Sequence, residues 1–252
     1  MRVFERLSQY DLNYDQVMKN KIQCYILLLG ILFMSPTVMA QPKISLELGL
    51  GIYEPILSGF DDNNQFPVAK VWNRNLLTNY GIFYQFFYNA RVGYSSYTSW
   101  DVGEMTSDGG SMPIFSRSIT YRMFPIETYF RIKPTIELNF SLTPIWGRSK
   151  ISLNTRLNQS GDDWNIFLSV YGNEPLEIAT TDAMRQDWLG YSGQLGIRYY
   201  LRSFLGLVLK LGFMHNYYSE KNWRLQGNTI TGPVYDIEKL PIYAFRIIYG
   251  IK

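Results

Sequence analysis

The feature of this sequence that most constrains its fold is a series of long runs in which apolar and polar residues alternate. In the clearest run, residues 194–201, apolar and aromatic side chains occupy the odd positions, and Gln, Gly, Arg and Tyr occupy the even positions. A β-strand turns successive side chains to opposite faces, so such a run forms a ribbon with one apolar and one polar face. About ten residues of this kind cross a bilayer within a closed barrel. The runs therefore predict an all-β protein, a single closed antiparallel up-and-down transmembrane β-barrel.

The number of alternating runs favours eight strands. The runs occupy residues 44–53, 80–95, 124–132, 136–146, 189–201, 205–213 and 243–251. The second run is either one long strand or two strands that meet near Asn89, and residues 68–77 supply the extra strand in the first case. Ten strands is the alternative, with two additional strands at 151–157 and 164–171.

The connections between the runs are of two kinds. Residues 133–135 and 202–203 predict tight turns, whereas long polar connections cover residues 54–66, 97–117, 148–187 and 218–239. Outer-membrane barrels have short periplasmic turns and long external loops. A mean hydropathy of −0.12 is compatible with this fold, because a barrel strand presents only every second residue to lipid.

The N-terminal 40 residues have the pattern of a cleaved signal peptide. The apolar stretch 22–33 follows Lys19 and Lys21, and the small residue Ala40 precedes Gln41, which predicts cleavage between these two residues. Twelve apolar residues are fewer than the roughly 20 that a spanning helix needs. Acidic residues before Met18 do not suit a signal peptide, so we expect translation to start at Met18. The barrel domain is then 41–252, and cleavage removes the only cysteine.

A soluble ligand-binding barrel of the lipocalin type also has about eight alternating strands, but its apolar faces point inward. The polar faces of the runs combine many glycines with charges of both signs. Small residues fit the interior of a narrow barrel, and opposite charges neutralise one another there. We therefore expect these faces to line the lumen and to form a charge network of Glu47, Arg91, Glu127, Arg131, Glu137, Arg198, Lys210 and Arg246.

Aromatic residues gather near the ends of the runs on the apolar faces. Strand-forming propensity explains their abundance but not this bias to the ends. Transmembrane barrels carry aromatic girdles at the level of the lipid headgroups. The sequence thus predicts a girdle of Tyr80, Tyr94, Trp146, Tyr191, Phe213, Tyr217 and Tyr243.

Residues 195–213, with the sequence LGIRYYLRSFLGLVLKLGF, resemble the penultimate hairpin of small outer-membrane β-barrel proteins of Bacteroidota. The resemblance covers mainly residues 119–252 and implies fold and location, without functional residues. It also implies two partners, the lipids of the outer membrane, including lipopolysaccharide, and the barrel-assembly machinery. That machinery usually reads a C-terminal aromatic residue, a role that falls here to Tyr249 or Ile251.

The sequence offers little chemistry. Its one histidine, His215, would need a serine nucleophile to act as a lipid deacylase, but Tyr217 stands where such an enzyme has Ser. We interpret the five carboxylates of the third long connection as charges on a solvent-exposed loop. Residues 61–64 resemble only part of a calcium loop. We expect no metal and no cofactor, and a net charge of +3 argues against nucleic acid.

The expected function is therefore non-enzymatic. Eight strands leave an interior just wide enough for side chains to fill it, so a structural or loop-mediated binding role fits best. The alternatives are a lipid-modifying enzyme and a small transport pore. No partner of the external loops can be named from the sequence.

Overall fold

The computed structural model describes residues 42–53, 56–58, 70–71, 74–107, 110–154, 160–178 and 183–251. The expected signal peptide, its Ala40–Gln41 cleavage site and the partial calcium loop at 61–64 lie outside these residues. In the described part of the chain, no helix has the length and hydropathy needed to cross a membrane.

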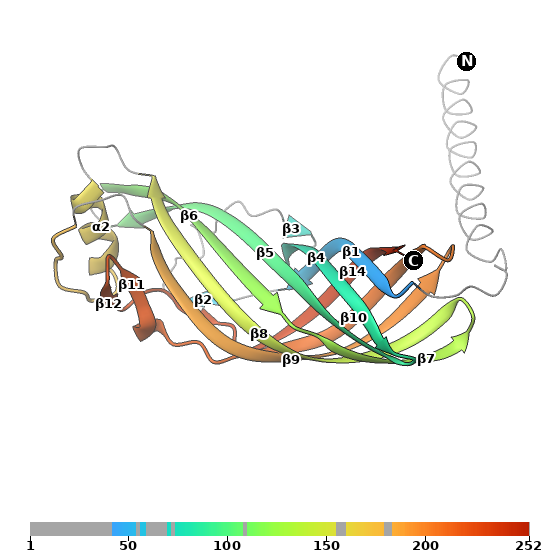
Figure 1. Cartoon of the computed structure of the whole chain (residues 1–252). Coiled ribbons are helices and arrows are strands. Elements are labelled where there is room, and N and C mark those ends of the chain that lie inside the picture. The colour runs from blue at the N-terminus through green and yellow to red at the C-terminus, as the bar shows by residue number, and fades with distance from the viewer. Residues whose placement is uncertain are drawn as a thin grey trace, which may run out of the picture. The chain divides into compact units, whose positions relative to one another are not determined.

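The described residues form a closed antiparallel barrel of eight strands, which confirms the predicted fold and excludes ten strands (Figure 1). The barrel strands are β1 (Ile44–Tyr53), β4 (Arg74–Phe87), β5 (Ala90–Ser107), β6 (Gly110–Met123) continued by β7 (Ile126–Lys133), β8 (Ile136–Asn154), β9 (Met184–Tyr200), β10 (Leu205–Asn216) and β14 (Lys239–Ile251). Each strand pairs with the next along the chain, and β1 closes the barrel by pairing with β14.

β6 and β7 act as one barrel strand that is interrupted at Phe124 and Pro125. Proline has no backbone N–H to donate to a ladder, so the strand bends there. The ladder continues on both sides, because Gly93 N–H donates to the Pro125 carbonyl at 3.0 Å and Phe124 N–H donates to the Pro144 carbonyl at 3.1 Å. The run at 80–95 resolves into β4 and β5, which meet at a turn of Tyr88 and Asn89.

Two of the expected long connections differ from the prediction. Residues 97–117 are mostly strand, because β5 and β6 continue as a long hairpin. Residues 164–171, the alternative strand, belong largely to a helix, α2 (Ser160–Ser169). The remaining elements are β2 (Ile56–Ser58), β3 (Lys70–Val71), the 3₁₀ turn η2 (Glu220–Asn222), β11 (Trp223–Leu225), β12 (Asn228–Ile230) and β13 (Val234–Asp236).

Four barrel strands are much longer than a membrane requires. β5, β8 and β9 have 18, 19 and 17 residues, and the barrel strand formed by β6 and β7 has 14 and 8 residues in its two parts, whereas about 9 to 11 residues cross a bilayer. Figure 1 shows these strands extending together toward α2, β11 and β12. We call this the outer end of the barrel, and the end with the short turns at 88–89, 134–135 and 201–204 the turn end. The barrel interior therefore has two halves, one toward the turn end and one toward the outer end.

Candidate functional site

The turn-end half of the lumen holds a layer of buried charged side chains that we call the charge layer. Its carboxylates are Glu47, Glu127 and Glu137, and all three are at most 1% exposed. Its cations are Arg91, Arg198, Lys210 and Arg246, and these are also buried. The seven residues come from seven barrel strands, and every one of them points inward. The structure thus brings together seven of the eight residues that the alternation pattern placed in the lumen.

Glu127 contacts three of the buried cations, and Glu47 contacts two. The Lys210 Nζ lies 2.5 Å from Glu127 Oε2, and the Arg198 Nη2 lies 3.1 Å from Glu127 Oε1. Arg198 also donates to Glu47, whose second oxygen accepts from Arg246 Nη1 at 2.7 Å. Because Arg198 contacts both carboxylates, the two ion pairs form one continuous network across the lumen.

Glu137 extends this network to a third carboxylate. Arg91 donates to Glu137, and its Nε lies 3.6 Å from Glu127 Oε1. Arg91 also stacks on the ring of Tyr129, with its guanidinium carbon 4.1 Å from the ring centroid. Buried charges are tolerated only when they are paired and hydrogen-bonded. The layer meets the first part of that condition, because each of its carboxylates and cations has an opposite charge within 4.0 Å, whereas buried atoms such as Arg198 Nη1 and Arg246 Nε have no hydrogen-bond partner among the described residues.

Two aromatic residues complete the layer, and the sequence prediction did not include them. Phe83 of β4, the one barrel strand without a charged member, lies within about 6 Å of Arg198, Lys210 and Arg246 as a cation–π partner. The Tyr97 hydroxyl accepts a hydrogen bond from Arg246. Phe83 occupies the polar phase of its run, and Tyr97 continues that phase just beyond the run, at the start of the expected connection 97–117; this phase was the available signal. An aromatic side chain at a position of the polar phase can serve as a partner of buried cations inside the barrel.

Glycines make room for the long cationic side chains. A Cβ at Gly49 would lie 2.9 Å from Arg246 Cγ and 2.0 Å from the Phe245 carbonyl oxygen. A Cβ at Gly196 would lie 3.0 Å from Lys210 Cγ and 2.4 Å from the Asn139 amide oxygen. The glycines of the polar faces therefore belong to the crowded interior, as the sequence led us to expect.

Arg131, the eighth expected member of the charge layer, lies outside it. The residue is exposed, and its guanidinium stacks over the ring of Tyr129 at 5.8 Å. The ladder between β7 and β8 shifts register between Arg131 and Lys133, next to the turn. Arg131 itself still pairs in register with the inward-facing Glu137, so it keeps the inward phase and lies outside the layer because it is next to the turn, where its side chain is exposed.

The expected aromatic girdle residues lie on the outer face of the barrel. Tyr80, Trp146, Tyr191, Phe213, Tyr217 and Tyr243 are exposed there, and Tyr94 is half-buried. Several contact one another across strands: the ring centroids of Tyr191 and Phe213 are 6.2 Å apart, and those of Tyr80 and Tyr94 are 6.3 Å apart. Between the two ends, the outward positions carry exposed Leu, Ile, Val and Phe side chains.

A second aromatic band, which the sequence reasoning missed, surrounds the turn end. It consists of exposed aromatic residues in or near the short turns, namely Tyr88, Phe130, Phe204 and Tyr249. The rings of Phe204 and Tyr249 lie 6.0 Å apart. The signal for this band was the presence of aromatic residues at the other ends of the alternating runs, next to the short turns. An apolar belt between two aromatic bands is the outer surface of a barrel that spans a membrane.

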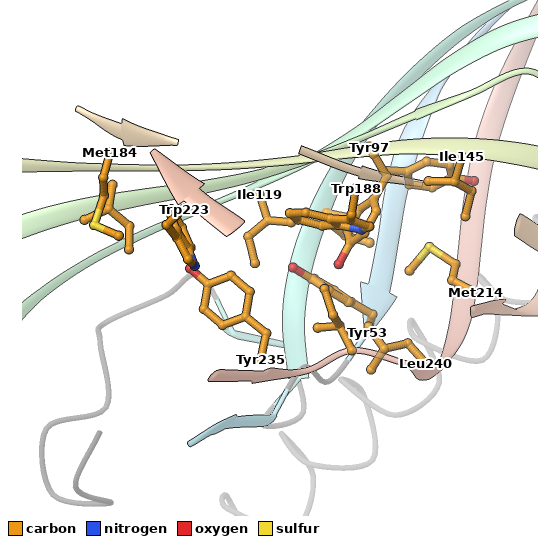
Figure 2. Packing of buried hydrophobic residues seen from close by; sticks show 14 of the residues in the cluster. Tyr53, Tyr97, Ile119, Ile145, Met184, Trp188, Met214, Trp223, Tyr235 and Leu240 are labelled. Carbon is orange, nitrogen blue, oxygen red and sulfur yellow. The ribbon is translucent and has the colours of Figure 1, made fainter. Parts of the chain in front are cut away.

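The outer half of the barrel interior is mostly apolar, with the buried Arg117 of β6 among its polar exceptions, which the sequence did not lead us to expect. Figure 2 shows Trp188 among Ile119, Tyr53 and Tyr97, and Trp223 next to Tyr235. A series of aromatic contacts at 4.9 to 6.0 Å runs through Tyr53, Tyr121, Trp188, Tyr218, Tyr235 and Trp223. This cluster, the outer core, fills the lumen between the charge layer and the long connections.

Helix α2 packs onto the outer core with one face. Trp164, Phe167 and Leu168 are buried, and Phe167 contacts Phe115 of β6 with a centroid distance of 5.7 Å. The chain after α2 is held by Asn173, whose side-chain amide donates to the Thr231 carbonyl at 2.7 Å and whose oxygen accepts from Thr231 N–H at 2.9 Å. The third and fourth long connections are therefore joined to each other.

Two buried phenols lie in this outer region. The Tyr218 hydroxyl donates to the Pro233 carbonyl and accepts from Trp223 Nε1 at 2.8 Å. Burial, with a smaller contribution from Tyr235, raises the pKa of Tyr218 and likewise that of Tyr171. Both hydroxyls therefore stay neutral at physiological pH.

His215 lies on the outer face among the girdle residues. Its ring is 5.0 Å from that of Tyr191 and 4.8 Å from that of Tyr217, and its Nδ1 lies 4.0 Å from Glu238 Oε1. Among the described residues, no hydroxyl group hydrogen-bonds to His215. The histidine and a carboxylate that a deacylase needs are close, but the described part of the chain supplies no nucleophile next to them.

The carboxylates of the third long connection do not form a cluster in the described part of the chain. Asp162 and Asp163 lie in the first turn of α2, Glu174 and Glu177 are exposed beyond the helix, and Asp182 lies outside the described residues. Among the described residues, no group of three or more His, Cys, Asp or Glu side chains is placed to hold a metal ion.

Comparison with known proteins finds similarity only at the level of structure, because the sequence matches no protein-family model and no curated protein. The neisserial surface protein A matches with a TM-score of 0.49 at 6% identity, over 83% of this chain and 97% of that protein. Ail, the attachment invasion locus protein of Yersinia pestis, matches with a TM-score of 0.46 at 13% identity, over 83% and 99% of the two chains. The outer membrane protein W of E. coli matches with a TM-score of 0.43 at 13% identity, over 84% and 98%. The chain is similar to these barrels.

Proposed function

We propose that this chain is a non-enzymatic integral protein of the bacterial outer membrane, with a lumen closed to solutes and a binding role carried by its outer end. The observation that carries the proposal is the charge layer. Seven charged side chains from seven strands meet in one plane and leave no described member of the layer more than a few per cent exposed. The outer core then fills the other half of the lumen. Two successive plugs are incompatible with diffusion of solutes through an eight-stranded barrel.

Conductance in a planar lipid bilayer tests the closed lumen. The refolded barrel should insert without giving a steady open current, because no continuous water path crosses the charge layer. A wide porin, reconstituted in the same way, controls for insertion and for the sensitivity of the recording. A stable, wide, ohmic conductance of the wild-type barrel would refute the proposal and favour the small transport pore.

The non-enzymatic part of the proposal rests on the surroundings of His215. Two tyrosine rings enclose the imidazole at the level of the girdle, a setting that suits an interfacial polar residue. His215→Ala should therefore leave the lipid A and phospholipid profiles of the host unchanged, as measured by mass spectrometry of extracted lipids. A profile that changes when the wild-type protein is expressed, and reverts with His215→Ala, would establish a lipid-modifying enzyme instead.

The proposal includes export across the inner membrane by the signal peptide in residues 1–40. The basic start after Met18 and the Ala40–Gln41 junction support it. The sequence of the β9–β10 hairpin further supports a place among the small outer-membrane barrels of Bacteroidota. Mass spectrometry of the mature protein should find Gln41 at its N-terminus, and a precursor peptide from residues 1–17 would contradict the start at Met18.

A further inference from the structure

A row of cations crosses the outer face of the barrel at its outer end. Lys150 of β8 pairs in register with Arg185 of β9, and Arg185 pairs in register with Arg224 of β11. The three side chains are exposed, whereas the flanking residues Gln186 and Trp223 are buried inside. The row therefore points away from the lumen, toward the surroundings of the barrel.

The next outward-facing row, two residues away along β8 and β9, pairs one more cation, Arg148, with one acid, Asp187. Arg148 donates to both oxygens of Asp187, from Nε at 2.6 Å and from Nη2 at 3.1 Å. Asp187 is thereby engaged, and among the described residues no carboxylate oxygen lies within 4.0 Å of the cationic groups of Lys150, Arg185 or Arg224. Like charges placed directly opposite each other across strands destabilise a sheet. An anion that lies against Lys150, Arg185 and Arg224 would offset the repulsion between their charges.

A pocket of about 720 Å³ lies at this row. Its walls include Arg148, Arg185, Arg224, Asn222, Gln226 and Thr229, together with Asp187, whose carboxylate is paired with Arg148, so hydrogen-bond donors outnumber the one carboxylate. The hairpin of β11 and β12 forms one wall, and it folds back sharply because Gln226 and Gly227 both adopt positive φ, at 49° and 86°. Among the described residues, two guanidinium groups without a carboxylate partner, those of Arg185 and Arg224, border this cavity and match the oxygens of a phosphate group, which arginine binds in a bidentate manner.

The height of the row identifies the source of the phosphate. Trp146 of β8 belongs to the aromatic girdle, and Arg148 and Lys150 follow it on the same outer face. At about 3.3 Å per residue, they lie roughly 7 and 13 Å farther along the strand, or about 5 to 10 Å higher for a strand tilted by about 40°. The polar headgroup region extends roughly 5 to 8 Å beyond the hydrocarbon core. Arg148 thus lies at the level of the headgroup phosphates, and Lys150, with Arg185 beside it in register, lies a few ångströms beyond it, a distance that a long cationic side chain spans.

We propose that this pocket binds the phosphate group of an outer-leaflet lipid, with Arg185 and Arg224 as its principal ligands and Lys150 and Arg148 beside them. The inference rests on the membrane placement in the proposed function and adds to it a lipid-binding site of defined chemistry. Arg148 and Arg122 also stack on Trp146, at 5.5 and 5.0 Å from its ring, so the site and the girdle are continuous.

Native mass spectrometry of the barrel in detergent tests the site with three probes: bis-phosphorylated lipid A, dephosphorylated lipid A and inorganic pyrophosphate. The wild-type barrel should retain the phosphorylated lipid preferentially. Arg185→Ala/Arg224→Ala should weaken that binding by about tenfold or more, since each substitution removes a charge-assisted hydrogen bond. The matched control, Arg131→Ala/Lys133→Ala, removes the same charge from exposed positions at the turn end and should change nothing.

Several results would overturn the inference. Equal retention of both lipids would show that phosphate is not recognised, and equal loss in both double variants would show a non-specific charge effect. Pyrophosphate binding as tight as that of the phosphorylated lipid would assign the pocket to a soluble anion. Arg224→Gln, a single change on the hairpin, serves as second variant if the double variant does not fold. A barrel that is found in the outer membrane but shows no preference for the phosphorylated lipid contradicts this inference alone.

Discussion

Glu127 is the residue on which the charge layer depends most. It lies within 3.6 Å of three cations, Lys210, Arg198 and Arg91, and is completely buried. A buried ion pair adds little net stability, because desolvation offsets the attraction between its charges. Removal of one partner is different, because the remaining charges are then buried without compensation.

Glu127→Ala should therefore destabilise the barrel by about 3–5 kcal/mol. Urea-dependent unfolding from lipid vesicles measures this loss. The control is Glu174→Ala, which removes an exposed carboxylate from the loop after α2 and should change the unfolding free energy by less than about 0.5 kcal/mol. Similar values for the two variants would mean that the layer is hydrated and its charges are not tightly coupled.

At the scale of single residues, alternation predicted which face each charge occupies but not how far along the lumen the polar phase extends. Seven charged residues lie in the layer because strand period alone determines their direction. Arg131 lies outside the layer although it pairs in register with Glu137, because its position next to the turn leaves its side chain exposed. Phe83 and Tyr97 were missed because their role depends on cations from other strands.

At the scale of elements, α2 is the clearest difference between prediction and structure. Residues 164–171 are rich in strand-forming side chains, but Trp164, Phe167 and Leu168 recur at the spacing of a helix face. Asp162 and Asp163 in the first turn favour the helix through its dipole. The helical signal was present, but the favoured eight-strand prediction placed this segment in a long connection, and only the ten-strand alternative made it a strand.

Trp164→Ala should release α2 from the outer core, because the indole is fully buried and its removal costs about 3–5 kcal/mol locally. The barrel itself should persist, since its ladders do not involve the helix. Limited proteolysis of the folded protein should then cleave near α2, while the barrel fragment keeps its resistance to unfolding in detergent. Ile166→Ala, an exposed change on the same helix, should leave the proteolysis pattern unchanged.

The outer core should loosen at alkaline pH. Burial raises the pKa of Tyr171 and Tyr218 above the ordinary value of about 10, so both phenols remain neutral in the folded state, whereas released phenols ionise near pH 10. Their contribution is therefore complete below about pH 10 and is lost as the pH rises further. Because Trp223 contacts Tyr218, tryptophan emission should shift to longer wavelength in this range. Tyr218→Phe should reduce the shift, whereas Tyr217→Phe, an exposed change, should not.

At the scale of the whole molecule, the sequence predicted closure, strand number and the long and short ends. The period of two and the tight turns carry that information locally. The sequence did not predict the apolar outer core or the extension of β5, β6, β8 and β9 beyond the membrane. Ile145 follows Thr143 on the polar phase of its run, and Ile119 lies outside the runs, so neither residue by itself indicates that the inward face becomes apolar toward the outer end; the pairing of distant strands shows it.

The central claim is that the apolar belt faces lipid and the charges face the lumen. Expression of the full precursor in a Gram-negative host, followed by isolation of the outer membrane and electrophoresis with and without boiling, tests it most directly. We predict a band in the outer-membrane fraction whose mobility shifts on boiling, because a closed barrel in lipid resists denaturation in detergent. Soluble periplasmic protein with no shift would contradict the account, because the apolar belt would then not be in contact with lipid.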